Sequence, residues 1–274
     1  MSKLKNTFMT DILFKLLFVK NPVLLQRLVA HLLRIPLVSI NEFEIRNTEM
    51  PPEVIGKKLC RLDIHMKVNG QEVNLEVQVD DEGDYPVRAL YYWARIYSNA
   101  LPASGKYCDL PRTIIISIVN FSLFDCAHFH SEYQSLEVTR HTPLTDKKVL
   151  LFFELPKLPK DISDIDENDL SLLWLALFNA NTEEEFAKIE ALGVPELNQA
   201  ISAYHNVTAS SEFRELERLR AKARHDEAQA LHHARAQRDI EIAKKLLALG
   251  DPIDRIVDVT DLPRAEVEAL RDAN

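Results

Sequence analysis

Two acidic residues, Asp63 and Glu76, stand on either side of Asn69-Gly70. Residues 60–68 and 71–80 alternate between apolar and polar. Asn-Gly between such segments predicts a β-hairpin with a type I′ turn, because both residues accept a positive φ. A two-residue loop would place Asp63 opposite Glu76, with Cβ atoms about 5 Å apart. Carboxylates that close favour a shared proton or a cation, and oxygen ligands on a rigid sheet suit Mg²⁺.

The same register divides the hairpin into two faces. One face is apolar and should lie on a core, since a shift of one residue would move every side chain to the other side. The other face is polar, and the alternative to a metal site is a solvated strand face that carries an incidental acidic pair. The apolar face pairs Val68 with Gln71, Met66 with Val73, Ile64 with Leu75 and Leu62 with Val77; the polar face pairs Lys67 with Glu72, His65 with Asn74, Asp63 with Glu76 and Arg61 with Gln78.

The composition is that of an ordinary globular protein. The chain has 274 residues, of which 46% are hydrophobic and 27% charged, enough for one large domain or two small ones. No apolar run reaches the roughly 18 residues of a membrane span, so no membrane partner is expected. The three cysteines are widely spaced and form no metal or disulfide pattern, which predicts buried free thiols and a cytoplasmic location.

The net charge of −9 argues against a protein that coats nucleic acid without specificity. Its distribution weakens this objection, because residues 1–155 hold 18 basic and 18 acidic residues. The acidic excess therefore lies in the second part of the chain, away from the hairpin.

The remaining elements are predicted from periodicity and from helix and strand signals. Asp11 and Lys15 are four residues apart on one helix face, in the order that favours an ion pair. The β-branched run in 110–120 predicts a strand that is buried on both faces, as in the middle of a mixed sheet. The predicted helices cover 8–34 with a break at Asn21-Pro22, and 87–100; the predicted strands cover 38–49, 110–120 and 148–155.

From residue 161 the chain is expected to be helical. Residues 211–249 lack Gly and Pro and should form one long, charged helix, which predicts a homodimer. Residues 250–274 resemble a helix-turn-helix, a pattern that short helical hairpins share. The predicted division is a core at 1–160, an acidic helical segment at 161–210 with helices at 170–179 and 183–192, the long helix at 211–249 and a helical tail at 250–274.

A family resemblance extends over nearly the whole chain. Several motifs carry it together, through their order and spacing. These motifs are Asp11 with Phe14-Lys15 and Phe18, then Asp63, Glu76-Val77-Gln78, Arg88 with Tyr91-Tyr92 and Tyr97, Gly105 and Tyr107, Phe153-Glu154-Leu155-Pro156-Lys157, and the AKKLL-containing tail. By these motifs the chain resembles the Rpn family of recombination-promoting nucleases, often labelled transposases, in the PD-(D/E)XK nuclease superfamily.

The resemblance implies an α/β fold of the restriction-endonuclease type: a mixed β-sheet flanked by helices, here with an all-α C-terminal extension. It also implies a metal-dependent DNA endonuclease that acts on double-stranded DNA. Asp63, Glu76 and the Val77 carbonyl would hold Mg²⁺, Mn²⁺ or Ca²⁺. Gln78 stands where most of the superfamily has lysine, and would orient the attacking water. Lys15 would supply the missing positive charge from the first helix.

Two other functions remain open on sequence grounds. The first is a DNA- or protein-binding module that keeps the fold without turnover, which the Gln78 substitution and the net acidity favour. The second is a true transposase, which usually needs a third acidic residue, and the sequence offers no clear one. Asp80 and Asp81 lie near the hairpin, but Asp81 would point to the opposite face.

Overall fold

The computed structural model describes residues 3–46, 49–50, 60–61 and 63–272. The chain divides into two compact units, Met1–Phe213 and Arg214–Asn274, and each unit is described by itself.

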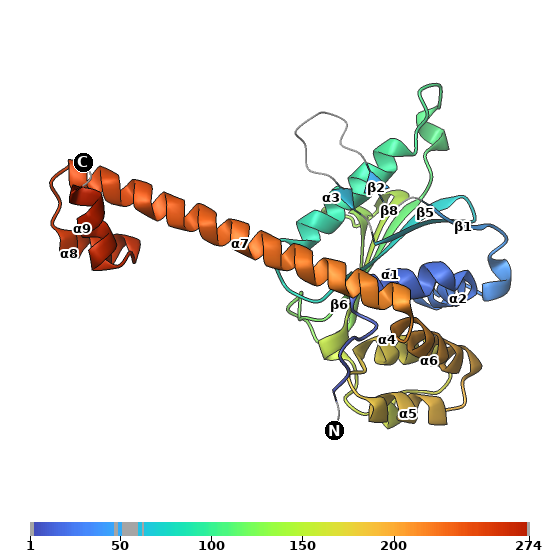
Figure 1. Ribbon diagram of the computed structural model, residues 1–274. Helices are drawn as coiled ribbons and strands as arrows, with labels where there is room; N and C mark the ends of the chain where they lie inside the picture. Colours follow the sequence, from blue (N-terminus) through green and yellow to red (C-terminus); the bar gives the residue numbers. More distant parts are fainter. Residues whose placement is uncertain (1–2, 47–48, 51–59, 62, 273–274) are drawn as a thin grey trace. The chain divides into compact units, whose positions relative to one another are not determined.

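The first unit is built on a mixed six-stranded sheet (Figure 1). Its order is β1-β4-β5-β6-β8-β7, in which β4 is antiparallel to β5, while β5, β6 and β8 run parallel to one another. A second sheet joins β2 to β3. The strands are β1 (Phe43–Ile45), β2 (Glu49–Met50), β3 (Cys60–Arg61), β4 (Ile64–Val68), β5 (Gln71–Gln78), β6 (Thr113–Val119), β7 (His130–Leu136) and β8 (Pro143–Glu154).

Helices cover both faces of the large sheet. Alternate residues of β6 show the two sides: Ile116 packs into the larger core with α1, α2, α4, α5 and α6, whereas Ile115 packs against α3. The helices of this unit are α1 (Asp11–Lys20), α2 (Pro22–Leu32), α3 (Tyr85–Asn99), α4 (Leu170–Asn179), α5 (Glu183–Ala191) and α6 (Pro195–Thr208), with 3₁₀ turns at Leu37–Ser39, Tyr107–Asp109, Leu155–Lys157 and Ile162–Asp164.

The predicted central strand is β6. All of its residues are buried, and it lies between β5 and β8, parallel to both. This confirms the expectation from its β-branched run, since a strand covered on both faces has no polar side. The break at Asn21-Pro22 is also confirmed, with Pro22 in the first turn of α2.

The Asn69-Gly70 hairpin has the predicted register over five pairs, from Val68–Gln71 to Ile64–Leu75. Both turn residues have positive φ, 48° at Asn69 and 78° at Gly70. The first strand is shorter than predicted, because β4 begins at Ile64. The predicted pairing of Arg61 with Gln78 is wrong, because Arg61 belongs to β3 and pairs with Glu49; Leu62 lies outside the described residues.

Three other expectations need correction. In place of one strand over 38–49, the chain forms a 3₁₀ turn and two short strands, β1 and β2. Helix α6 lies within the segment 161–210 that was predicted to be helical, but the helices expected there were only those at 170–179 and 183–192. The thiols of Cys108 and Cys126 are free but exposed, so their predicted burial is wrong; the Cys60 side chain is outside the described part.

The second unit contains most of the long helix α7 (Ser211–Ala248) and two short helices, α8 (Ile253–Thr260) and α9 (Arg264–Asp272). The predicted long helix is therefore present. A small core forms at its C-terminal end, where Ala243 packs with Ile256, Leu262 and Val267. Among the described residues, no helix is both long and apolar enough to cross a membrane.

Candidate active site

Lys15 connects two acidic residues that are distant in sequence. Its Nζ lies 3.0 Å from Asp11 Oδ1, one turn earlier in α1, and 3.0 Å from Asp63 Oδ1. The i, i+4 spacing accounts for the first contact. The packing of α1 on the sheet accounts for the second, because Leu13 and Leu17, on the side of the helix opposite Lys15, are buried in the core.

Asp63 lies just before β4 and is not part of the ladder. Its backbone N–H donates to Glu76 Oε1 at 3.0 Å, and its carboxylate Oδ2 accepts from the Val77 N–H at 2.9 Å. Asp63 and Glu76 therefore lie together as predicted, but through these hydrogen bonds and not as a cross-strand pair. The departure from the ladder turns the Asp63 carboxylate toward Lys15 and the Val77 backbone.

Glu76 is buried in β5, and its orientation is fixed by two donors. Asn74 Nδ2 donates to Oε1 at 2.6 Å, and the Asp63 N–H donates to the same oxygen. Asn74 is fully buried and lies two residues earlier, so both side chains point to one face of the strand. With Oε1 occupied, Oε2 is the oxygen left for a proton or a cation.

Burial raises the pKa of Glu76 to about 8, and the negative charge of Asp63 adds to this effect. Burial also raises the pKa of Asp63, although Lys15 and the Val77 N–H oppose the shift. For Lys15, burial lowers the pKa, but Asp63 and Asp11 outweigh it and the net direction is upward. In the absence of a cation, Glu76 is mainly protonated at neutral pH while Lys15 is charged.

Gln78 follows Glu76 on the same face of β5, at the end of the strand. Its Nε2 donates to the Asp80 carbonyl at 3.0 Å. The Gln78 carbonyl accepts from the Asn120 N–H, on the side of β6. Backbone groups alternate in direction along a strand, so those of Val77 point to the β4 side, where its N–H meets Asp63. The Val77 carbonyl thus faces the same side as the Asp63 carboxylate.

The polar face of the hairpin is not solvated. His65, Glu72, Asn74 and Glu76 are all buried. His65 Nε2 lies 2.8 Å from Glu72 Oε2, and Arg46 lies 3.2 Å from the other oxygen of Glu72. Burial without partners would be costly, and these contacts offset it. The expectation of a solvated strand face, which the alternative to a metal site required, is therefore wrong.

Two hydroxyls from neighbouring elements complete the surroundings of Glu76. Ser117 is the register partner of Glu76 in β6, and Tyr85 lies at the start of α3. Both are buried, and the Ser117 hydroxyl lies beside that of Tyr85, where its hydrogen bonding opposes part of the rise in the Tyr85 pKa. Burial raises the pKa of Tyr85 well above its usual value, and the charge of Glu76 contributes. On the side of β6 and α3, the Glu76 carboxyl thus faces hydroxyl groups that carry no charge at neutral pH.

The donor set fits a divalent cation that keeps much of its hydration. Mg²⁺ is commonly held by one or two carboxylates, with water and substrate phosphate completing its shell. Within the described part of the chain, no three His, Cys, Asp or Glu side chains form a ligand cluster. Two adjoining buried carboxyls with raised pKa values would be stabilised in their charged forms by such an ion. Asp63, Glu76 and the Val77 carbonyl are the groups available to hold it.

A family comparison agrees with this geometry. The model of the PD-(D/E)XK nuclease family transposases matches residues 8–234. The chain belongs to this family. The match covers α1, the hairpin and the whole large sheet, so the architecture is the restriction-endonuclease-like mixed sheet with flanking helices, extended by C-terminal helices. Membership supports a nuclease- or transposase-like function. No curated protein and no solved structure matches the chain.

The family segment around Glu154 has a structural role that the sequence did not reveal. Glu154 is fully buried, and its Oε2 accepts from the Leu123 N–H at 2.6 Å and the Phe124 N–H at 3.2 Å. Lys157 Nζ lies 2.6 Å from the same oxygen and also donates to the Phe124 carbonyl. This ion pair holds the segment that follows β6 in place. Strand β6 lies beside β5, which carries Glu76.

Asn74 was also missed as a site residue. The feature that could have indicated it is its position two residues before Glu76, on the same face of the strand. An uncharged amide is one of the few polar groups on that face that can donate a hydrogen bond. Lys15 in α1 was not missed, because it was already among the candidate site residues. Asp11 joins the site through Lys15, whereas Asp80 contributes only its backbone carbonyl to Gln78.

Proposed function

We propose that this chain is a divalent-metal-dependent endonuclease that hydrolyses phosphodiester bonds in double-stranded DNA. One observation carries the proposal: the Asp63 and Glu76 carboxyls adjoin at the end of a hairpin, with the Lys15 ammonium 3.0 Å from Asp63. Membership in the PD-(D/E)XK nuclease family transposases supports the reaction class.

The cation would be held by Asp63, Glu76 and the Val77 carbonyl, with Mg²⁺ expected and Mn²⁺ or Ca²⁺ as substitutes. A bound ion of this kind supplies a Lewis acid for the scissile phosphate and lowers the pKa of a bound water. Because both donors bond to Glu76 Oε1, its other oxygen is left for the cation. Asn74 thereby acts as a positioning residue for Glu76.

Lys15 and Gln78 would together fill the role that one lysine has elsewhere in the superfamily. Lys15 places a positive charge beside Asp63, where it would neutralise charge on the phosphate during the reaction. Gln78 is uncharged and lies at the end of β5, and its amide would orient the attacking water. This requires Gln78 Nε2 to leave the Asp80 carbonyl when substrate binds.

A binding module without turnover is the second candidate. The observation that favours it is the Gln78 amide, which bonds to Asp80 and not to Asp63 or Glu76. A role in strand transfer is a further possibility within the family. Asp11 would be its third acidic residue, although the described residues hold it 3.0 Å from Lys15 and not in a three-carboxylate cluster.

The deciding experiment is plasmid cleavage by the purified full chain, with Mg²⁺ or Mn²⁺ against EDTA. Asp63→Asn and Glu76→Gln should abolish nicking while the proteins remain folded. Asp125→Asn is the matched control, because Asp125 is exposed. DNA retention without cleavage by any form would favour the binding module. Equal cleavage by the parent and both site variants would refute the proposed site.

We also propose that the protein acts as a homodimer in recombination or mobile-element biology, in the cytoplasm. The long α7 carries basic and acidic residues along an exposed surface, as partner-packing helices often do. Light scattering at micromolar concentration should give about twice the 31.4 kDa of one chain. A mass near 31.4 kDa would rule out the dimer without bearing on the nuclease site.

A further inference from the structure

Arg88 lies near the start of α3, close to the acidic site. It follows Tyr85 by three residues, so both side chains lie on one face of the helix. The guanidinium carbon of Arg88 is 4.9 Å from the centre of the Tyr85 ring. Burial and then the charge of Glu76 raise the pKa of Tyr85, while the charge of Arg88 opposes part of the rise. Arg88 and Glu76 thus both act on Tyr85, which places Arg88 in the surroundings of the site.

The positive charge of Arg88 has few partners for its depth. Its side chain is only 19% exposed, and its Nη1 donates to Glu82 Oε2 at 2.7 Å. Nε and Nη2 are enclosed and make no hydrogen bond within the described residues. A buried charge is costly unless it is paired. The carboxylate of Glu82, which is itself 61% exposed, is therefore the anion that compensates Arg88 in the free protein.

The loop at 79–84, between β5 and α3, occupies a donor at each of its ends. Gln78, directly before the loop, donates to the Asp80 carbonyl. Arg88, after the loop, donates to the Glu82 carboxylate. Both acceptors belong to exposed residues and can be exchanged for other oxygen acceptors. A phosphate group offers such oxygens together with a negative charge, so it can replace the Glu82 carboxylate at Arg88.

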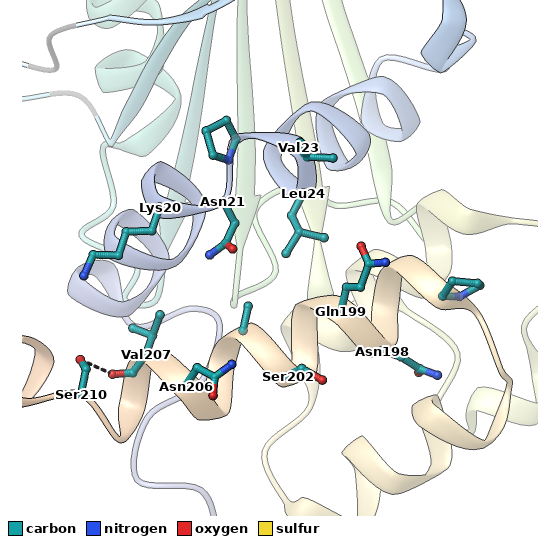
Figure 2. A pocket seen from close by; sticks show the side chains of 13 residues that line it. Lys20, Asn21, Val23, Leu24, Asn198, Gln199, Ser202, Asn206, Val207 and Ser210 are labelled. Carbon is teal, nitrogen blue, oxygen red and sulfur yellow. Dashed lines mark hydrogen bonds between the residues drawn. The ribbon is translucent and has the colours of Figure 1, made fainter.

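An ion pair elsewhere in the same unit provides a comparison. Lys20 pairs with Glu212 beside a cleft of about 800 Å³ between the α1–α2 junction and α6 (Figure 2). The Lys20 side chain is 45% exposed, against 19% for Arg88. Water already solvates an exposed ammonium of this kind, and its ion pair contributes little. Lys20 therefore gains less than Arg88 from an added anion.

We propose that Arg88 binds a backbone phosphate of DNA adjoining the scissile one, in exchange for Glu82. The inference rests on the proposed function, because it assumes that DNA lies at the acidic site. When DNA binds, Nη1 passes from the Glu82 carboxylate to a phosphate oxygen, and Glu82 turns to solvent. Hydrogen bonds between guanidinium and phosphate are charge-assisted and therefore strong. Lys15 from α1 and Arg88 from α3 then both contact DNA beside the same acidic pair.

The test measures binding of a fluorescent DNA duplex to the full chain by anisotropy, in EDTA, over a range of salt concentrations. Arg88→Met should weaken binding by about tenfold. It should also reduce the slope of log Kd against log salt by about 0.9, the value for one lost phosphate contact. Arg88→Lys, which keeps the charge, should restore most of the slope. Lys20→Met is the matched control and should leave both quantities nearly unchanged.

Glu82→Gln tests the exchange itself, on an exposed residue. Removal of the competing carboxylate should tighten binding by about two- to fivefold. The gain should disappear in the Arg88→Met background, because the competitor then has no guanidinium to occupy. Glu212→Gln, the equivalent change at the Lys20 pair, should leave the Kd unchanged. Melting curves check that each variant is folded.

Three results would each overturn the proposal. They are an unchanged Kd and slope in Arg88→Met, a gain from Glu82→Gln that persists without Arg88, and a parent protein that retains no duplex. Plasmid cleavage separates this inference from the endonuclease proposal. The predicted changes in binding without cleavage in Mg²⁺ would refute the endonuclease and uphold the role of Arg88. Cleavage by the parent, with equal binding by all variants, would do the reverse.

Discussion

Lys15 in α1 forms an ion pair with Asp63, 3.0 Å from Nζ to Oδ1, at the point where the chain enters β4. The strand position two residues after Glu76 holds Gln78, which has no charge. A positive charge therefore reaches the acidic site from a helix and not from β5. Its Asp63 contact is largely screened from water, since the Asp63 side chain is only 13% exposed.

Replacement of Lys15 by Met should lower the rate of DNA cleavage by about 10²-fold or more, because a preorganised charge at the reacting phosphate is lost. The rate is measured on plasmid under single-turnover conditions. Lys20→Met, in the same helix, is the matched control, and its surface ion pair with Glu212 should have little effect. Equal cleavage rates for the two variants would show that Lys15 does not take part in the reaction.

The raised pKa of Glu76 predicts a pH dependence of stability in the metal-free protein. A carboxyl with a pKa of about 8 in the folded state and an ordinary value of 4.5 in the unfolded state binds its proton more tightly when folded. Stability is then highest below pH 4.5 for this group and is lost as the pH rises toward 8. The melting temperature should therefore fall between pH 5 and pH 8.

Glu76→Gln tests this assignment, since glutamine keeps the acceptor for Asn74 and Asp63 but cannot ionise. Its melting temperature should fall less over the same range. Mn²⁺ should raise the melting temperature of the parent at pH 8 more than at pH 5, and should not affect the variant. An identical pH profile for the parent and Glu76→Gln would show that Glu76 does not titrate in this range.

Asn74→Leu should affect both folding and chemistry. The change removes a 2.6 Å hydrogen bond to a buried carboxyl, which should lower the free energy of unfolding by about 1–3 kcal/mol. That bond favours the charged form of Glu76, so its loss should raise the pKa further and move the pH–rate profile to higher pH. Gln237→Leu is the control, because Gln237 is an exposed amide on α7, away from the acidic pair in sequence.

Glu154→Ala should destabilise the first unit strongly. It leaves Lys157 and two backbone N–H groups without their shared acceptor, and such a loss at a buried pair costs about 3–5 kcal/mol. Urea unfolding measures the change. Glu215→Ala, which breaks an exposed ion pair with Arg218 on α7, should leave the free energy of unfolding almost unchanged. A similar small cost for Glu154→Ala would mean that the segment after β6 is held by other contacts.

The local elements of the site were predictable from the amino-acid sequence. Asn69-Gly70 specified the turn and its register, the β-branched run specified the buried strand β6, and the four-residue spacing of Asp11 and Lys15 specified their ion pair. These features depend on neighbours in the chain, so their patterns are visible without a structure. The proposed residues Asp63 and Glu76 were likewise found from the alternation of the hairpin.

The way in which these residues meet depends on the three-dimensional packing of the chain. Asp63 lies outside the strand ladder and forms hydrogen bonds with Glu76 and Val77. The alternation of residues along a strand cannot predict such a position. The burial of the polar face depends on its position within a sheet that helices cover on both sides, and it sets the pKa of Glu76. The contact of Lys15 with Asp63 depends on how α1 packs on the sheet. Packing is a property of the whole fold, so no local pattern encodes it.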